Sequence, residues 1–372
     1  MRLSSRAEKT RQNFIQAAIL EISERGIDLV TVSGIIDRAN AARPTFYSNF
    51  GSIAGLFADI WLNFGKEFLN EITDYDDGSP SNNYTKTPLF RALIEILSIS
   101  RRNPELLEVV EPTIKEWWES ILNRSEIEQQ ASIWLFGHRL GLHITLPIDD
   151  DAVHSEFIIP LLKSIRNTKL EVLAPTRAQV NELDEGNETT KTPETNLLEN
   201  TIAVVASTGV SGASLIRIAR RSRISTGAIY PNYQNATDLL IASLQYAFPS
   251  ILESNMKRAK GYRVSPADLG RFVNAAFIDS RQNWRRFRLE MLLAARTNST
   301  IREPYRASLK NTMEELGGYI DTNGFNESLE IGMPYLSHTL GVGLGILHDL
   351  GIPIDKIDHR ILSENGAKFL TK

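Results

Sequence analysis

One stretch of the chain occurs twice in the same register, and this repeat restricts the fold more than any other feature of the sequence. Residues 14–57 align without a gap on residues 197–240, which lie 183 positions later. The identical pairs are Ile19/Ile202, Gly26/Gly209, Ile35/Ile218, Arg38/Arg221, Tyr47/Tyr230, Asn49/Asn232 and Leu56/Leu239. Cap residues and the central tyrosine also keep their order, so the repeat predicts one supersecondary unit built twice.

The first copy begins with a pattern typical of a long helix followed by a short one. Apolar residues recur at helical spacing from Phe14 to Ile22, and Gly26 can take the left-handed conformation that commonly ends a helix. Thr31 is expected to cap a short second helix, and Ser214 is its counterpart in the second copy.

A third, short helix is expected at the centre of each copy. In the first copy it covers about residues 43–50, with Pro44 in the first turn, where a missing N–H had no intrahelical partner. Ser52 is expected to cap a longer fourth helix. In the second copy the same helix would contain Pro231 in its interior, where proline costs about 3 kcal/mol or forces a kink.

Weaker similarities extend the repeat beyond these helices. Residues 100–108 parallel 295–303, and residues 137–148 parallel 341–352. We therefore predict an all-α fold of two tandem units, each with a helix-turn-helix domain and a larger helical domain. The predicted parts are 1–51 and 52–167 for the first unit, 168–196 for a polar, proline-punctuated linker, and 197–234 and 235–372 for the second unit.

Composition narrows the class of protein. An apolar fraction of 42% and a charged fraction of 23% are typical of a soluble globular chain, and no apolar run reaches the length of a spanning helix. Cysteine is absent and the six histidines are scattered, so no metal site is expected. No motif for phosphate binding or hydrolysis occurs. We expect a cytoplasmic protein that is not an enzyme, uses no cofactor and does not enter a membrane.

Two short helices joined by a tight turn are the unit that places a recognition helix in the major groove of DNA. Arginine can read guanine, asparagine can read adenine, and hydroxyl groups commonly hold phosphates. The predicted DNA-binding residues are Thr31, Arg43, Thr45, Tyr47, Ser48 and Asn49 in the first copy and Ser214, Arg221, Arg223, Thr226, Tyr230 and Asn232 in the second. The alternative for the two tyrosines is a half-buried aromatic that supports the small domain.

The distribution of charge agrees with this interpretation. Residues 1–51 hold seven basic and five acidic side chains, a net charge of +2, and residues 197–235 hold four basic and one acidic, a net charge of +3. The whole chain carries −4. Positive charge is thus concentrated on the two segments that would face DNA.

The sequence "TVSGIIDRANAARPTFYSNFGSIAGLF" resembles the helix-turn-helix of TetR-type regulators, and "SLIRIARRSRISTGAIYPNYQNATDLL" is similar to it. The resemblance covers about 45 residues in each unit. It implies an all-helical fold, DNA binding by the first three helices, and a larger domain that dimerises and binds a small-molecule effector. Two departures concern phosphate contacts: Ile53 and Ala236 replace the usual lysine of the fourth helix, and Asn49 and Asn232 replace a histidine.

The larger domains carry little motif of their own. Trp117, Trp134 and His138 are the candidate ligand-binding residues, although aromatic residues at such positions are more often core. The glycines of residues 137–148 and 341–352 predict closely packed helices at an interface. The segment "WRRFR" at 284–288 is interpreted as a partly packed surface helix, and the acidic run at 149–151 as a solvated capping loop.

A chain with two such units predicts an intramolecular pseudo-dimer that binds a double-stranded DNA operator, with further homodimerisation left open. We expect a repressor that an unidentified small molecule releases from a pseudo-palindromic site. The alternative is a helical ligand- or partner-binding regulator in which only the first head contacts DNA.

Overall fold

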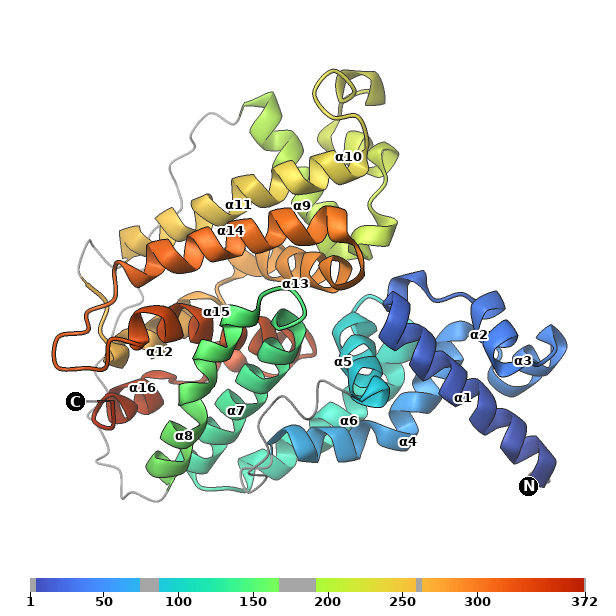
Figure 1. The fold of residues 1–372 in the computed structure, drawn as a ribbon, viewed down its shortest axis with the longest axis horizontal. Coiled ribbons are helices and arrows are strands. Elements are labelled where there is room, and N and C mark those ends of the chain that lie inside the picture. Colours follow the sequence, from blue (N-terminus) through green and yellow to red (C-terminus); the bar gives the residue numbers. More distant parts are fainter. Residues whose placement is uncertain (1–4, 74–86, 167–191, 259–262, 371–372) are drawn as a thin grey trace. The chain divides into compact units, whose positions relative to one another are not determined.

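The computed structural model describes residues 5–73, 87–166, 192–258 and 263–370, and helices make up nearly all of the regular structure in these ranges (Figure 1). The only strand-like feature in the described ranges is an isolated bridge between Val264 and Ile320. The predicted all-α class is therefore confirmed. The chain divides into two compact units, Met1–Asn123 and Arg124–Lys372.

The first unit contains the first predicted head and three longer helices. Its elements are α1 Ser5–Arg25, η1 Ile27–Leu29, α2 Val32–Ala39, α3 Arg43–Phe50, α4 Ile53–Thr73, α5 Pro88–Ser100 and α6 Pro104–Leu122. The rings of Phe46 and Phe50 lie 5.6 and 5.8 Å from that of Phe14, both edge-on. This aromatic cluster packs the short α3 against α1, because apolar burial compensates for the weak intrinsic stability of an eight-residue helix.

The second unit contains the rest of the described chain. Its elements are α7 Glu126–Thr145, η3 Asp150–Phe157, α8 Ile158–Arg166, α9 Pro193–Gly212, α10 Leu215–Ser222, η4 Thr226–Ala228, α11 Ala236–Arg258, η5 Pro266–Asp268, α12 Leu269–Ala275, η6 Asp279–Arg281, α13 Gln282–Thr297, α14 Ser299–Gly317, α15 Leu329–Asp349, η7 Ile354–Lys356 and α16 Arg360–Ala367. Helices α7 and α8, which precede the second copy of the repeat, thus pack with elements that follow it.

The caps expected in the first copy are present. The Thr31 side chain accepts a hydrogen bond from the Gly34 N–H at 3.1 Å, and Ser52 accepts one from the Gly55 N–H at 2.8 Å. Gly26 follows α1 with φ 80°, which a residue with a Cβ adopts only under strain. Local hydrogen bonding therefore sets the ends of these helices as the sequence predicts.

The second copy departs from expectation at its recognition segment. Ser214 caps α10 by accepting from the Arg217 N–H, as predicted, but residues 226–233 do not form an α-helix. A short 3₁₀ turn, η4, stands there instead. Pro231 has no N–H to donate to the carbonyl of Gly227, and its ring would clash with that carbonyl. The prediction of a second α-helical recognition element is therefore wrong.

The predicted linker 168–196 falls largely outside the described ranges. At the end of the linker, Thr192 caps α9 by accepting from the Thr195 N–H at 3.1 Å, so the helix begins at Pro193. The last residues assigned to the linker are helical.

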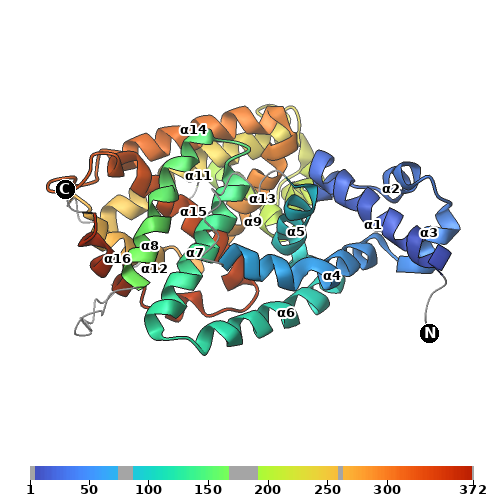
Figure 2. The same cartoon turned by 60° about the horizontal axis from the view of Figure 1, so that its bottom comes forward.

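Glycines bring α7 and α15 into close contact, as the two glycine-rich segments predict (Figures 1 and 2). A Cβ built at Gly141 would overlap the carbonyl oxygen of Thr339, and one built at Gly343 would overlap that of Gly137. Neither side has room for a methyl group. Small residues at the crossing thus let the two helix backbones approach closely.

The acidic run after α7 caps a helix, as predicted, but it is only partly solvated, because Asp150 is exposed and Asp149 is not. Asp149 is completely buried, where it caps η3 and accepts a 2.6 Å hydrogen bond from the Tyr335 hydroxyl of α15. Burial and this bond to a carboxylate raise the pKa of Tyr335. The expectation of solvation fails for Asp149 alone, because this residue belongs to the contact between η3 and α15.

Candidate DNA interface and ligand cavity

The α3 helix of the first head divides its side chains between core and solvent. Phe46 and Phe50 are buried, whereas Tyr47 is 46% exposed and Arg43 and Ser48 are also exposed. The Tyr47 ring packs edge-on against that of Phe46 at 5.4 Å, so one side of it supports the head and the other side is open to solvent. Hydroxyl and guanidinium groups line the outer face of α3, where they can reach a polyanion.

Several of these side chains already have partners within the head. A guanidinium nitrogen of Arg43 donates to the Ser33 hydroxyl at 3.2 Å. The amide of Asn49 and the hydroxyl of Ser48 both donate to the carbonyl of Thr45, at 2.8 and 3.0 Å. Tyr47 and Arg43 are therefore the better placed of the predicted contacts, since Asn49 and Ser48 use a donor inside the helix.

Arg11 on α1 holds α3 in place, a role that the sequence pattern did not reveal. Its guanidinium donates to the Asn49 carbonyl at 3.0 Å, pairs with the carboxylate of Asp59 on α4, and lies 4.8 Å from the centre of the Phe50 ring. One side chain thus connects α1, α3 and α4. The sequence offered one signal for this role, a basic residue in the first predicted helix and an acidic residue in the fourth.

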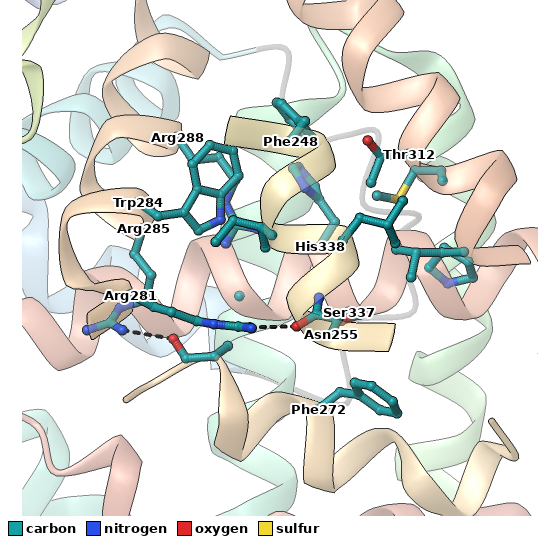
Figure 3. Close-up of a pocket in the computed structure, with 17 residues that line it drawn as sticks. Phe248, Asn255, Phe272, Arg281, Trp284, Arg285, Arg288, Thr312, Ser337 and His338 are labelled. Carbon is teal, nitrogen blue, oxygen red and sulfur yellow. Dashed lines mark hydrogen bonds between the residues drawn. The ribbon is translucent and has the colours of Figure 1, made fainter. Parts of the chain in front are cut away.

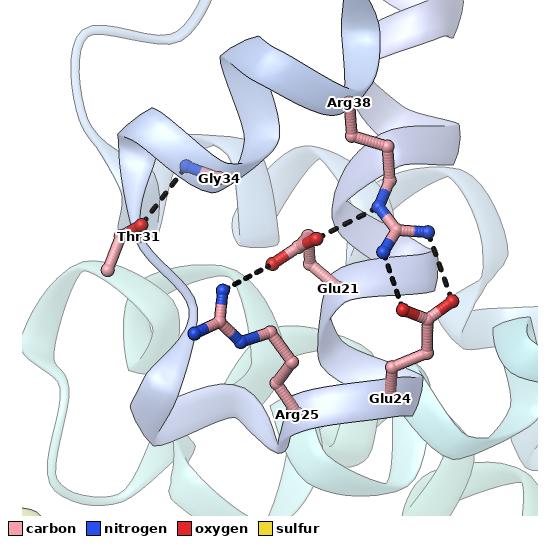
Figure 4. Close-up of polar contacts among 6 residues, drawn as sticks. All are labelled: Glu21, Glu24, Arg25, Thr31, Gly34 and Arg38. Atoms are coloured by element: carbon pink, nitrogen blue, oxygen red, sulfur yellow. Dashed lines mark hydrogen bonds and ion pairs between the residues drawn. The ribbon is translucent and has the colours of Figure 1, made fainter.

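The guanidinium of Arg38 on α2 forms ion pairs within the head and is not left open to contact DNA (Figure 4). Its guanidinium donates to Glu21 at 2.9 Å and pairs with Glu24, while Arg25 also reaches Glu21 at 3.4 Å. The hydrogen bond to Glu24 raises the pKa of Arg38 and lowers that of Glu24. These acids on α1 offset much of the positive charge of the first head.

Three contacts join the first head to the helices that follow it in the same unit. The hydroxyl of Ser52 donates to the Glu105 carboxylate of α6 at 2.8 Å, and Arg102 pairs with Asp28 at 2.6 Å. In addition, the backbone N–H of Ile27 donates to Glu95 of α5 at 2.6 Å. A shift of α5 or α6 would therefore act directly on the ends of α1 and α4.

The second head exposes more unpaired positive charge than the first. Arg221, Arg223, Tyr230 and Asn232 are exposed, Tyr230 at 57%, and Thr226 is half-buried. Within the described chain Arg221 has no ion pair, whereas Arg38, its counterpart, has two acids. The reason is in the sequence, since Val204 and Ser207 occupy the positions of Glu21 and Glu24.

The two heads share backbone conformations position by position. Gly26 and Gly209 have φ 80° and 74°. In the described chain Asn40 and Arg223 are the only residues other than glycine with positive φ, at 48° and 57°, and they too are 183 positions apart. The second head thus keeps the turn of the motif even though its third helix is lost.

The three predicted ligand residues do not line one cavity. Trp117 is buried on α6 in the first unit, while Trp134 and His138 are buried on α7 in the second. The Trp134 indole donates to His359 at 2.8 Å, and His138 lies 3.1 Å from the Thr339 hydroxyl of α15. Desolvation lowers the pKa of His138 to about 3. Trp134 and His138 therefore pack between helices, and Trp134 also lines a small pocket with Phe157 and Leu161. The assignment of these residues to a ligand site stays a prediction.

A cavity of about 80 Å³ lies elsewhere in the second unit, among α11, α13, α14 and α15 (Figure 3). Its lining includes Phe248, Phe272 and Trp284, together with the guanidinium groups of Arg281, Arg285 and Arg288. Residues 284–288 are partly packed, as interpreted, but Trp284 and Arg285 are buried and line the cavity, whereas Arg286 is half-buried. An amphipathic pattern alone did not show that the arginines face inward.

In the described ranges, no group of three or more histidine, aspartate or glutamate residues could hold a metal ion. None of the described helices is long and apolar enough to cross a membrane.

Residues 14–60 match the family model described as bacterial regulatory proteins, tetR family. Over 61 residues the chain is 36% identical to a probable acrEF/envCD operon repressor of Escherichia coli K12, a match that covers 16% of this chain and 28% of the repressor. Over 86 residues it is 28% identical to the HTH-type transcriptional regulator BetI of Paraburkholderia phytofirmans, covering 23% and 44%. The matches thus span less than half of each relative.

Among solved structures, the transcriptional regulator FadR from Bacillus subtilis, determined with stearoyl-CoA, aligns with a TM-score of 0.32 and 19% identity. That alignment covers 48% of this chain and 97% of FadR. The matched relatives are transcriptional regulators and not enzymes. Residues 14–60 accordingly carry a tetR-family N-terminal domain with a DNA-binding helix-turn-helix.

Proposed function

We propose that the chain is a transcriptional repressor in which two tetR-type units, joined covalently, form one pseudo-dimer on a pseudo-palindromic operator. The observation that carries this proposal is the shared backbone register of the two heads. Gly26 and Gly209 end the first helix, Thr31 and Ser214 cap the second, and the same left-handed turn follows at 40 and 223. Two unrelated segments have no reason to repeat all three features at one spacing.

The packing of α7 on α15 supports the pseudo-dimer. Residues 137–148 of α7 and its flank correspond to 341–352 in the second copy, a spacing of 204. Gly137 contacts Gly343, and Gly141 contacts Thr339. A later residue of α7 thus contacts an earlier residue of α15, so the two helices cross in an antiparallel sense. Both pairs centre on one crossing, near His138 and Val342. Equivalent helices that cross antiparallel about one point are what a two-fold interface requires.

The two heads are proposed to act unequally. The first has an α-helical recognition element with Arg43 and Tyr47 on its open face. The second has a 3₁₀ turn in that place but carries exposed arginines at 221 and 223. We assign base reading mainly to the first head, and contact with the phosphate backbone mainly to the second.

Release from DNA is proposed to begin in the larger helical domains. Within the first unit, α5, the turn that follows it and α6 contact the head through Glu95, Arg102 and Glu105 respectively. A ligand that moves either helix would change the orientation of α1 or α4, and thereby the affinity of the head for DNA. The predicted five-part division of the chain stays a prediction in this scheme.

The proposal is tested by selecting bound fragments from genomic DNA, followed by footprinting and native mass measurement of the complex. We expect one chain per operator and two unlike half-sites about one helical turn apart, roughly 34–36 Å. A symmetric operator that binds two chains, each through its first head, would overturn the pseudo-dimer and support the alternative of a single DNA-binding head.

A further inference from the structure

The three arginines that line the cavity in the second unit differ in how their charge is satisfied. Arg281 donates to Asn255 at 2.6 Å and to Ser254 at 2.8 Å, and Arg285 donates to the carbonyls of Ala276 and Ile278 at 2.8 and 3.0 Å (Figure 3). These two guanidinium groups are therefore held by neutral oxygens.

Arg288 has no such partners. The Nε of all three arginines is buried without a hydrogen bond, but within the described chain only Arg288 has neither an ion pair nor a hydrogen bond at its terminal nitrogens; the Trp284 ring lies 6.0 Å from its guanidinium. Desolvation lowers its pKa to about 10, so the side chain stays charged at neutral pH. An unpaired charge in such a place destabilises the free protein, and this cost calls for a compensating role.

The surroundings are shaped to keep this guanidinium at the cavity. A Cβ built at Gly341 would lie 2.8 Å from a terminal nitrogen of Arg288, and its three nearest atoms would all belong to that guanidinium. Glycine at 341 therefore leaves space for the guanidinium itself. None of the described residues that line the cavity is acidic, and the rest of the lining is largely apolar.

We propose that this cavity binds a small organic carboxylate, with Arg288 as its counter-ion and the apolar lining around its short hydrocarbon part. A planar guanidinium binds a carboxylate through two parallel hydrogen bonds, which an amide of the same shape cannot reproduce. A volume of about 80 Å³ restricts the ligand to a few heavy atoms beyond the carboxylate. The role of effector for this ligand rests on the proposed function, whereas its binding does not.

The site is expected once per chain. In the register that relates residues 100–108 to 295–303, a spacing of 195, Leu93 of α5 stands where Arg288 stands on α13. Leu93 is buried among apolar residues. The first unit therefore has no equivalent counter-ion, and one carboxylate should bind each chain.

The test uses isobutyrate and its neutral isostere isobutyramide on the full chain without DNA, by calorimetry and thermal unfolding. Wild type is expected to bind one isobutyrate at least tenfold more tightly than the amide. Arg288→Met should abolish that preference and, without ligand, raise Tm by up to about 2 °C, because a half-buried charge without an ion pair is removed. Gly341→Ala should weaken binding of the carboxylate, because the added methyl group crowds the guanidinium.

Arg286→Gln is the matched control, because Arg286 lies on the same helix but is paired with Asp349 at 3.0 Å. It should lower stability and keep the preference for isobutyrate. The proposed site would be overturned if wild type bound isobutyrate and isobutyramide equally, or if Arg288→Met still preferred isobutyrate. Since no DNA is present, either result is independent of operator binding. A gel shift with added isobutyrate then asks separately whether the ligand releases DNA.

Discussion

Asn40 and Arg223 adopt the same left-handed backbone conformation, with φ 48° and 57°, at equivalent positions of the two heads. Each residue follows the second helix of its head as its C-cap, and the N–H of each bonds to helix carbonyls. Asparagine tolerates this conformation better than arginine does. The second head therefore keeps a strained cation at a position where strain could easily be avoided.

Replacement of these two residues by glycine should separate strain from function. Arg223→Gly is expected to stabilise the protein by about 0.5–1 kcal/mol, because glycine adopts positive φ freely, and to weaken DNA binding by removing a cation. Asn40→Gly should change stability less. Chemical unfolding and gel shifts provide the two measurements. A loss of stability in Arg223→Gly would show that the arginine side chain contributes packing.

The exposed tyrosines should contribute unequally to DNA affinity. Tyr47→Phe removes only a hydroxyl group, and the loss of one phosphate hydrogen bond of about 1 kcal/mol weakens binding about fivefold. Tyr230→Phe should weaken binding less than twofold, since its segment is not helical. Titrations by fluorescence anisotropy would measure both. Tyr319→Phe, far from either head in the sequence, should have no effect, and equal losses at 47 and 230 would contradict unequal heads.

Arg38 and Arg221 occupy equivalent positions of the repeat, but their replacement should have different effects. Arg38→Ala leaves the buried carboxylate of Glu21 with a single, 3.4 Å partner, so we expect a loss of about 1–2 kcal/mol in unfolding free energy. Arg221→Ala should leave stability within about 0.5 kcal/mol. If Arg221 contacts phosphate, its loss lowers the slope of log affinity against log salt by about 1. An unchanged salt slope would remove Arg221 from the interface.

The α7–α15 crossing offers a matched pair of glycine substitutions. Gly141→Ala forces a methyl group into the Thr339 carbonyl and should destabilise the protein by about 1–3 kcal/mol. Gly345, its equivalent in the repeat, has open space, the nearest atom being 4.0 Å away. Gly345→Ala should therefore stabilise α15 by up to about 1 kcal/mol. Urea unfolding measures both, and equal effects would show that the crossing is looser than described.

Buried histidines should make stability depend on pH. Desolvation lowers the pKa of His138 and His143 to about 3 and that of His359 to about 4, below the unfolded value near 6.5. Between these values the unfolded chain binds more protons, so stability is complete above pH 6.5 and falls as pH decreases towards 3–4. Each histidine contributes at most about 1.4 kcal/mol per pH unit.

The contribution of His138 is isolated by comparing unfolding free energies at several pH values in His138→Leu and wild type. The variant should show a shallower decrease between pH 6.5 and 4. His154 is exposed, and His154→Gln should leave the slope as in wild type. If His138→Leu also keeps the wild-type slope, His138 does not remain neutral in the folded protein.

Much of the first head could be predicted from sequence because its determinants are local. The Thr31 and Ser52 caps bond to residues three positions away, and Gly26 needs only its own backbone freedom. The effect of Pro231 was predictable as a distortion but not as the complete loss of the α-helix. Its outcome depends on how Ile229 and Tyr233 are buried against the rest of the head.

The residues that line the cavity could not be predicted from sequence, because burial and pairing depend on contacts between distant segments. Trp134 and His138 are residue types that are common in binding sites. Their polar atoms, however, pair with His359 and Thr339, more than 200 positions away. Arg288 lies in a run that looks solvated, and only the packing of α11, α14 and α15 around α13 turns it towards a cavity.

The amino-acid sequence by itself determined the helical class, the caps, the repeat of the head and the tetR-type motif at residues 14–60. These follow from interactions within a few turns of chain. Tertiary structure alone decided which arginines are neutralised, which glycines touch a neighbouring helix, and where a cavity remains. Those outcomes depend on side chains that hundreds of residues of intervening chain bring together, and no local pattern records them.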